Sequence, residues 1–178
     1  MRDQSPSGVA LSPLTGILAF VAAIGHGIRL SRWRGLATID EPLLFILHVA
    51  YLWLPIGYGL LGLATFGIVF PQTAALHALT MGGIGSMVLA VTTRVALAHT
   101  GRALHAARLT VIAYGIFTVA VVIRILSPLT IDGYFTMIDL AATGWILAYA
   151  FFSWVYWPIL TRPRADGKPE RPVPDPGA

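Results

Sequence analysis

Histidines set in apolar sequence are the residues of this chain best suited to chemistry. His26, His48, His77 and His99 lie inside or at the ends of long apolar runs. A neutral imidazole nitrogen is a common ligand for haem iron and for copper, and ionisable groups in such runs are costly and usually functional. The chain has no cysteine, which excludes thiolate metal sites, iron–sulfur clusters and disulfides. Any metal would therefore depend on histidine, methionine, carboxylate, tyrosine or backbone ligands.

The composition places these histidines in a membrane protein. Of the 178 residues, 56% are hydrophobic and 11% are charged, whereas about a quarter of a soluble domain is charged. Apolar runs of about 20 residues match the thickness of a bilayer. The net charge of +4 then reflects membrane topology. We expect the lipid bilayer as a partner and, because no basic patch is interleaved with aromatic residues, no nucleic acid.

Five apolar spans predict an all-α, polytopic membrane helix bundle with about five transmembrane helices. The spans cover residues 13–30, 43–69, 74–98, 109–126 and 134–160. They form a membrane domain at 13–160, which follows a polar tail at 1–12. A proline-rich, charged tail at 161–178 comes last, and we expect it to be disordered and cytoplasmic. Pro55 lies near the middle of the second span and predicts a tilt or a kink there.

The positive charges predict the orientation of the bundle. Ten of the twelve lysines and arginines fall at the end of and after the first span, at the end of and after the third span, or in the C-terminal tail. These three regions lie on one side of a five-span bundle. Because cytoplasmic loops are enriched in lysine and arginine, we expect the N-terminus outside and the C-terminus in the cytoplasm.

This topology predicts one layer of histidines near the cytoplasmic side. His26, His48 and His99 would share the layer, with Arg94 just above them. His26 and His48 form the natural pair to clamp a haem between two helices. Tyr51 lies one helical turn from His48, where its phenol could donate a hydrogen bond or a proton. Arginines near this layer (Arg94, Arg29 or Arg102) could pair with haem propionates. The alternative is that each histidine only bonds a carbonyl or hydroxyl of a neighbouring helix.

A second group of residues is expected near the outer side. His77 and Met81 are four residues apart and share a helix face, and nitrogen with soft sulfur suits Cu(I). Methionine is also an ordinary filler of apolar cores, so packing is the alternative. Asp139 could pair with Arg124 or take a proton or a ligand. The small residues from Gly82 to Ser86 predict close helix packing.

Four segments carry a resemblance to a known family. HALTMGGIGSMVLAVTTRVALAHTGR at residues 77–102 closely resembles the signature of the NnrS family. HGIRLSRWRG at 26–35, LHVAYLWLPIGYGLLGLA at 47–64 and TRPRADGKP at 161–169 resemble it in the same order. The similarity covers nearly the whole chain after residue 14, and it matches the C-terminal half of the longer family members.

The resemblance implies a multi-pass protein of the bacterial inner membrane that acts in the nitric-oxide response. It implies links to denitrification and to nitrosative-stress tolerance, and it implies haem and copper as cofactors, with nitric oxide as a partner. The family's histidines would be His26, His48, His77 and His99, and its intramembrane arginine would be Arg94. Because the family members are longer, a second copy or a separate polypeptide equivalent to the N-terminal half is an expected partner.

The sequence is therefore consistent with three functions. The first is a haem-binding, and also copper-binding, membrane protein of nitric-oxide defence, for which the sequence carries no prediction of catalytic turnover. The second is an electron-transfer subunit resembling a membrane cytochrome b, with two axial histidines for each haem. The third is a non-catalytic structural subunit in which every histidine only bonds its neighbours.

Overall fold

The computed structural model describes residues 12–167, and within that range the protein is helical and contains no strand. Five helices are long and apolar enough to cross a membrane, which confirms the predicted all-α bundle. The elements are α1 (Pro13–Arg32), η1 (Gly35–Thr38), α2 (Pro42–Thr65), α3 (Gln72–His77), η2 (Ala78–Gly85), α4 (Ser86–His99), α5 (Arg108–Leu126), η3 (Ser127–Leu129) and α6 (Tyr134–Thr161).

Local sequence signals explain where the first two spans begin and end. Ser12 caps α1, with its hydroxyl accepting a hydrogen bond from the Thr15 backbone N–H, and a proline occupies the first turn of both α1 and α2, a position where its missing N–H costs nothing. The second span ends at Thr65 instead of residue 69. Gly67 and Val69 have φ angles of 70° and 51°, which no helix continues through.

The third span is a single run of 28 residues from Gln72 to His99, interrupted by the π-helix η2. The sequence did not predict this wider turn. Its glycines do explain why the chain packs closely there: a Cβ built on Gly82 would lie 2.7 Å from the Trp53 ring. Gly82 is buried and Ser86 is 1% exposed, which confirms the predicted close packing of this stretch.

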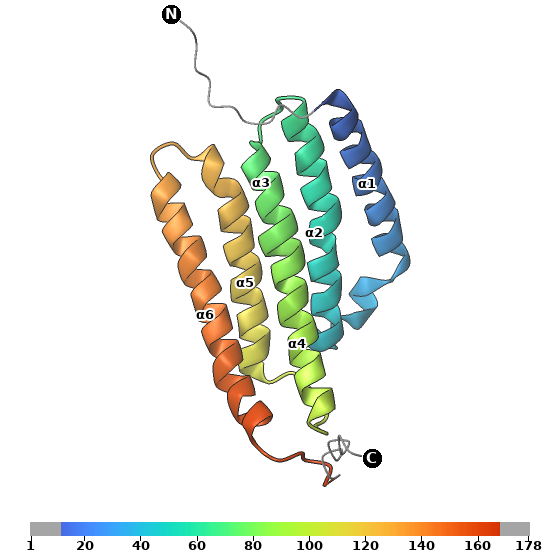
Figure 1. Cartoon of the computed structure of the whole chain (residues 1–178), viewed down its shortest axis with the longest axis vertical. Coiled ribbons are helices and arrows are strands. Elements are labelled where there is room, and N and C mark those ends of the chain that lie inside the picture. Colours follow the sequence, from blue (N-terminus) through green and yellow to red (C-terminus); the bar gives the residue numbers. More distant parts are fainter. Residues whose placement is uncertain (1–11, 168–178) are drawn as a thin grey trace, which may run out of the picture.

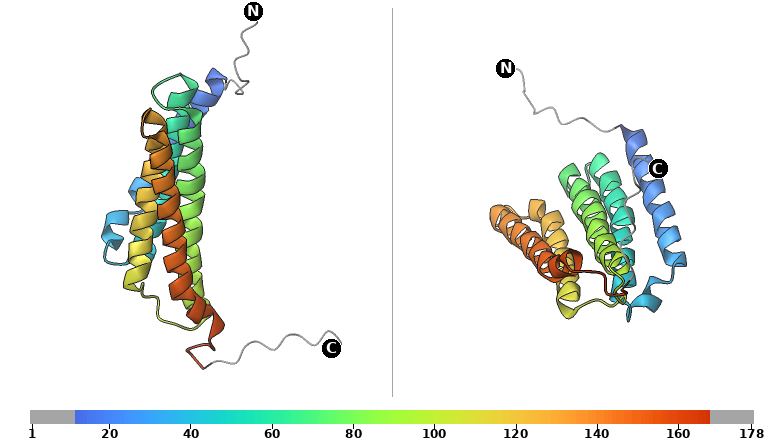
Figure 2. Two further views of the ribbon diagram at one scale, coloured as in Figure 1. Left: turned by 90° about the vertical axis from the view of Figure 1, so that its left-hand side faces the viewer. Right: turned by 60° about the horizontal axis from the view of Figure 1, so that its bottom comes forward.

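The helices stand side by side as two pairs flanking the third span. α1 packs against α2, α5 packs against α6, and α3, η2 and α4 lie between the pairs (Figure 1). The right-hand view of Figure 2, tilted so that the bottom comes forward, shows the same order from α1 to α6. In α1 and in α6, only 11% of an apolar stretch of 18 residues is buried inside the bundle, whereas 44% of the corresponding stretch of the third span is buried. The outermost helices, α1 and α6, therefore offer most of their apolar surface to lipid.

The arginine-rich regions meet at one end of the bundle. The end of α1, the end of α4, the start of α5 and the end of α6 all lie there (Figure 1). The described part of the predicted tail is held at this end, because Arg164 donates a 2.7 Å hydrogen bond to the His99 carbonyl and forms a 2.6 Å ion pair with Asp166. Residues 1–11 and 168–178, which hold most of the two predicted tails, lie outside the described range. The cytoplasmic side remains a prediction from charge.

Candidate functional site

His26 is bound to the second helix through a tyrosine. Its Nδ1 shares a 2.7 Å hydrogen bond with the Tyr51 hydroxyl, and its ring stacks on Tyr58 with centroids 5.6 Å apart and planes 4° apart. The helical spacing had paired Tyr51 with His48. In the structure, Tyr51 is instead hydrogen bonded to His26 on the neighbouring helix. The bond occupies one ring nitrogen, so only Nε2 of His26 is open to another partner.

Trp33 connects this group to His48. Its ring lies 4.6 Å from the Tyr51 ring and 6.1 Å from the His48 ring, measured between centroids. The Arg29 guanidinium lies over the same indole at 5.3 Å, a distance at which a cation is attracted to the ring face. The rings therefore form a continuous row from Tyr58 through His26, Tyr51 and Trp33 to His48.

His48 is oriented by its own helix. Its Nδ1 lies 3.0 Å from the Leu44 carbonyl, and an N–H at Nδ1 must donate this bond because a carbonyl oxygen only accepts. That tautomer leaves the lone pair on Nε2, the arrangement that metal-binding histidines commonly have. The ring also packs on Gly35, where a Cβ would lie 2.8 Å from the His48 Cδ2 atom. Glycine is thus required for η1 to approach this closely.

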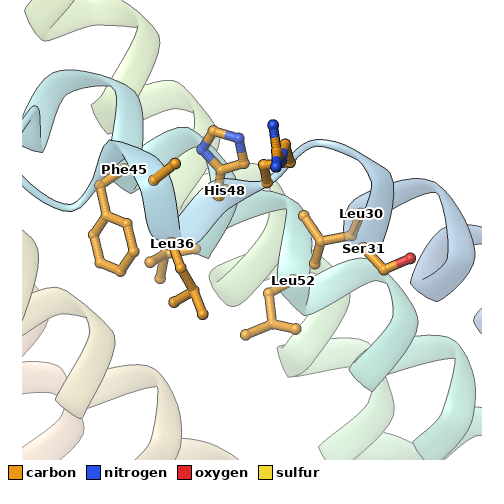
Figure 3. Close-up of a pocket in the computed structure, with 10 residues that line it drawn as sticks. Leu30, Ser31, Leu36, Phe45, His48 and Leu52 are labelled. Atoms are coloured by element: carbon orange, nitrogen blue, oxygen red, sulfur yellow. The ribbon is translucent and has the colours of Figure 1, made fainter.

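His48 lines a pocket of about 510 Å³ between the end of α1, η1 and the start of α2. Figure 3 shows Leu30 and Ser31 from α1, Leu36 from η1, and Phe45, His48 and Leu52 from α2 around it. The volume falls in the range of about 300–1,000 Å³ that is usual for small-molecule sites. Arg34 also lines the pocket, and its side chain makes no hydrogen bond or ion pair with the described residues.

The histidines do not form the single layer predicted from the sequence. His26 contacts Tyr51 and Tyr58, so it lies roughly 5–15 Å farther along α2 than His48, at 1.5 Å per residue. The reason is the connection after α1: Arg34 adopts a left-handed φ of 52° and η1 folds back onto α2. α2 therefore begins beyond the end of α1. His26 does not line the pocket that His48 lines.

His99 and Arg94 are separate from both His26 and His48. His99 is exposed at the end of α4. Arg94 is half-buried on α4, and its guanidinium makes no hydrogen bond or ion pair with the described residues. Within residues 12–167, no three histidine or acidic side chains are close enough to hold a metal ion together.

The structure brings together some of the residues that were expected near the outer side. His77, Met81 and Arg124 line one pocket of about 310 Å³. Of the two alternatives for Asp139, the ion pair with Arg124 does not form among the described residues: Arg124 donates instead to the Ser127 hydroxyl at 2.9 Å, and Arg164–Asp166 is the ion pair of the described range. Asp139 is exposed.

Sequence reasoning missed Trp33, Tyr58, Gly35 and Arg34 as site residues. Tyr58 carried a usable signal, because it follows Tyr51 by seven residues and so lies on the same helix face. Gly35 and Arg34 carried none, since their roles depend on how the connection folds.

Comparison with known families gives one match. A family model described as NnrS protein matches residues 6–164, which is most of the chain. No match was found among curated proteins or solved structures.

Proposed function

The chain belongs to the NnrS family, and on that premise we propose that it binds haem through His48. Membership makes it an NnrS-like protein of the nitric-oxide response, and the five spans make it a multi-pass membrane protein. We propose the bacterial inner membrane as its location, and a role linked to denitrification and nitrosative-stress tolerance, from the same resemblance.

The single observation that carries the haem proposal is the His48 pocket. The imidazole has its Nδ1 hydrogen bonded to the Leu44 carbonyl, so its Nε2 would be the atom that holds a haem iron. The walls are mostly apolar, from Leu30, Leu36, Phe45, Val49 and Leu52. Such walls suit a flat macrocycle, and the donor set of this pocket therefore fits haem.

Two polar residues at this pocket suit the edge of the same group. Arg34 has all five guanidinium N–H groups available within the described structure, and a carboxylate such as a propionate is the partner this fork matches best. Ser31 keeps its hydroxyl on the Ile28 carbonyl at 2.8 Å, so its oxygen can only accept a further hydrogen bond. Arg34 would therefore hold the propionate edge, and His48 the iron.

With His48 as the one protein residue on the iron, a bound haem would supply a metal to which nitric oxide could bind. The gas is uncharged and small, so a site between helices at the edge of the bilayer is within its reach. His26 is hydrogen bonded to Tyr51 and does not line the pocket. This geometry favours a single protein ligand over the two axial histidines of a cytochrome b-like subunit.

The residues present fit copper less well than they fit haem. His77 and Met81 offer two donors in their pocket, but the Arg124 guanidinium lines it too, and a fixed positive charge opposes binding of a cation. We therefore propose no copper chemistry for this chain by itself. A second copy or a separate polypeptide would have to add ligands.

The proposal is tested by haem content after purification in detergent. We expect His48→Gly to lose haem, and we expect added imidazole to restore it by occupying the space of the deleted ring. His99→Gly and His105→Gly, at exposed positions, are the matched controls and should keep haem. A folded His48→Gly protein that retains full haem without imidazole would show that another residue is the ligand.

A further inference from the structure

A second pocket, at the end of the bundle opposite the His48 site, brings an arginine and a histidine together. It has a volume of about 310 Å³ and lies between the third span, α5 and α6. Its polar lining is His77 and Arg124, and the remainder is Met81 with five residues of α6: Ile138, Ala141, Ala142, Trp145 and Ile146. No carboxylate lines it. The pocket is therefore positively charged where it is polar, and apolar elsewhere.

Arg124 lacks an anionic partner within the described residues. Its Nη1 donates to the Ser127 hydroxyl at 2.9 Å, and its other N–H groups bond none of residues 12–167. The Asp139 carboxylate, which the sequence offered as a partner, makes no ion pair in that range. A guanidinium close to hydrocarbon is costly unless an anion neutralises it. Phosphate is an anion that the bilayer itself supplies, and arginine binds it through paired N–H groups.

His77 adds the opposite kind of hydrogen-bonding group. Its Nδ1 lies 2.6 Å from the Thr73 carbonyl, so Nδ1 carries the proton and Nε2 is an acceptor. An acceptor beside an anion-binding arginine suits a ligand that has a hydroxyl next to its phosphate. The primary ammonium of an ethanolamine headgroup would also donate to Nε2, but the Arg124 charge in the same pocket repels it. A choline headgroup has no N–H and cannot donate to Nε2.

The apolar part of the pocket extends toward the middle of the membrane. Arg124 is in the last turn of α5, whereas Trp145 is eleven residues into α6, about 16 Å from its start at 1.5 Å per residue. Trp145 and Ile146 are both exposed on the bundle surface. A ligand whose phosphate contacts Arg124 can therefore place a hydrocarbon chain along them.

We propose that this pocket binds one anionic phospholipid with a glycerol headgroup. Arg124 binds the phosphate, His77 Nε2 accepts a hydrogen bond from a headgroup hydroxyl, and one acyl chain lies along Trp145 and Ile146. This site is independent of the proposed haem site, because the two pockets share no residue. Basic pockets between transmembrane helices bind anionic lipid headgroups on the cytoplasmic side of membranes, and this pocket would do so at the end of the bundle opposite the arginine-rich regions.

The test compares lipids on the full chain in detergent. Binding of phosphatidylglycerol, phosphatidylcholine and inorganic phosphate is measured by native mass spectrometry and by the thermal unfolding midpoint. We expect phosphatidylglycerol to bind about tenfold more tightly than phosphatidylcholine, with little effect of inorganic phosphate. Arg124→Gln should remove that preference. Arg108→Gln, which removes an exposed arginine at the opposite end of the same helix, should preserve it.

Two further variants keep the test decisive if Arg124→Gln folds poorly. Ala142→Leu fills the pocket from an exposed position without altering the arginine, and it should weaken phosphatidylglycerol binding. His77→Leu should narrow the preference for a glycerol over a choline headgroup. Equal binding of the two lipids by the wild-type chain would overturn the proposal. So would an unchanged preference in Arg124→Gln, undiminished phosphatidylglycerol binding in Ala142→Leu, or protection by inorganic phosphate equal to that by the lipid.

Discussion

The Tyr51 hydroxyl and the His26 Nδ1 lie 2.7 Å apart across the interface of α1 and α2. The two rings also meet edge to face, with centroids 5.5 Å apart. This bond holds the His26 side chain against α2. Together with the stack on Tyr58, it links the first two helices. His48, one turn before Tyr51, does not share this bond and lines the neighbouring pocket.

Removing the Tyr51 hydroxyl should loosen this link. Tyr51→Phe leaves the ring in place and deprives the half-buried His26 Nδ1 of its partner. We expect the free energy of unfolding to fall by about 0.5–1.5 kcal/mol, measured by denaturant unfolding in detergent and followed by circular dichroism. Tyr58→Phe is the control, because the Tyr58 hydroxyl has no hydrogen bond to the described residues. Equal stability of both variants and the wild type would contradict the role of this bond.

Two glycines on α2 allow the effect of close packing on stability to be measured apart from the effect of helix propensity. A Cβ on Gly57 would lie 2.6 Å from the Leu79 side chain and 3.2 Å from its backbone nitrogen, whereas a Cβ on Gly59 meets nothing within 4 Å. Gly57→Ala should therefore destabilise the bundle by about 1–3 kcal/mol. Gly59→Ala should be neutral or slightly stabilising, because alanine favours a helix. Thermal unfolding of the two variants measures the difference, and a Gly57→Ala protein as stable as Gly59→Ala would argue against this packing.

A buried hydroxyl pair joins the third span to α5. Thr93 is fully buried, and its Oγ1 is hydrogen bonded to the hydroxyl of Tyr114, which is 5% exposed. Thr93→Val leaves the tyrosine hydroxyl without this partner and should cost about 1–3 kcal/mol of stability. Thr92→Val changes the neighbouring exposed threonine and should cost much less. The comparison uses the same unfolding assay, and equal losses would indicate that burial of the pair is unimportant.

The orientation predicted from charge can be measured with single cysteines, because the chain has none of its own. We expect a cysteine at Ala103, in the connection between α4 and α5, to react only with a reagent that crosses the membrane. A cysteine at Asp132, between η3 and α6, should react with an impermeant maleimide in intact cells. Both positions are exposed. The opposite labelling pattern would reverse the topology.

Much of the fold was accessible from sequence, because length and hydropathy alone define a membrane span. The five spans were predicted in this way, and the close packing at Gly82 was predicted from the small residues between Gly82 and Ser86. The π-helix was not, since it changes the hydrogen-bond register without changing composition. The end of α2 was placed four residues too late because Gly67 and Val69 take left-handed φ angles within sequence that is still apolar.

The site was less predictable, because it depends on relations between helices. Counting residues from the ends of the spans placed His26 and His48 at one depth, but the fold of η1 shifts α1 along α2. Spacing within α2 also paired Tyr51 with His48, whereas the rotation of α1 brings His26 to the tyrosine. Such shifts and rotations are set by packing across the interface, as at Gly35 and Trp33, and a pattern within one helix does not encode them.

The central claim is that the His48 pocket holds a haem with an open iron position. The most direct measurement is the absorption difference spectrum of the purified, reduced protein with and without nitric oxide, for the wild type and for His26→Ala. We predict a shift of the Soret band in the wild type and the same shift in His26→Ala, because His26 is not an iron ligand in this account. A haem spectrum that nitric oxide leaves unchanged in the wild type, and that becomes responsive only in His26→Ala, would contradict it.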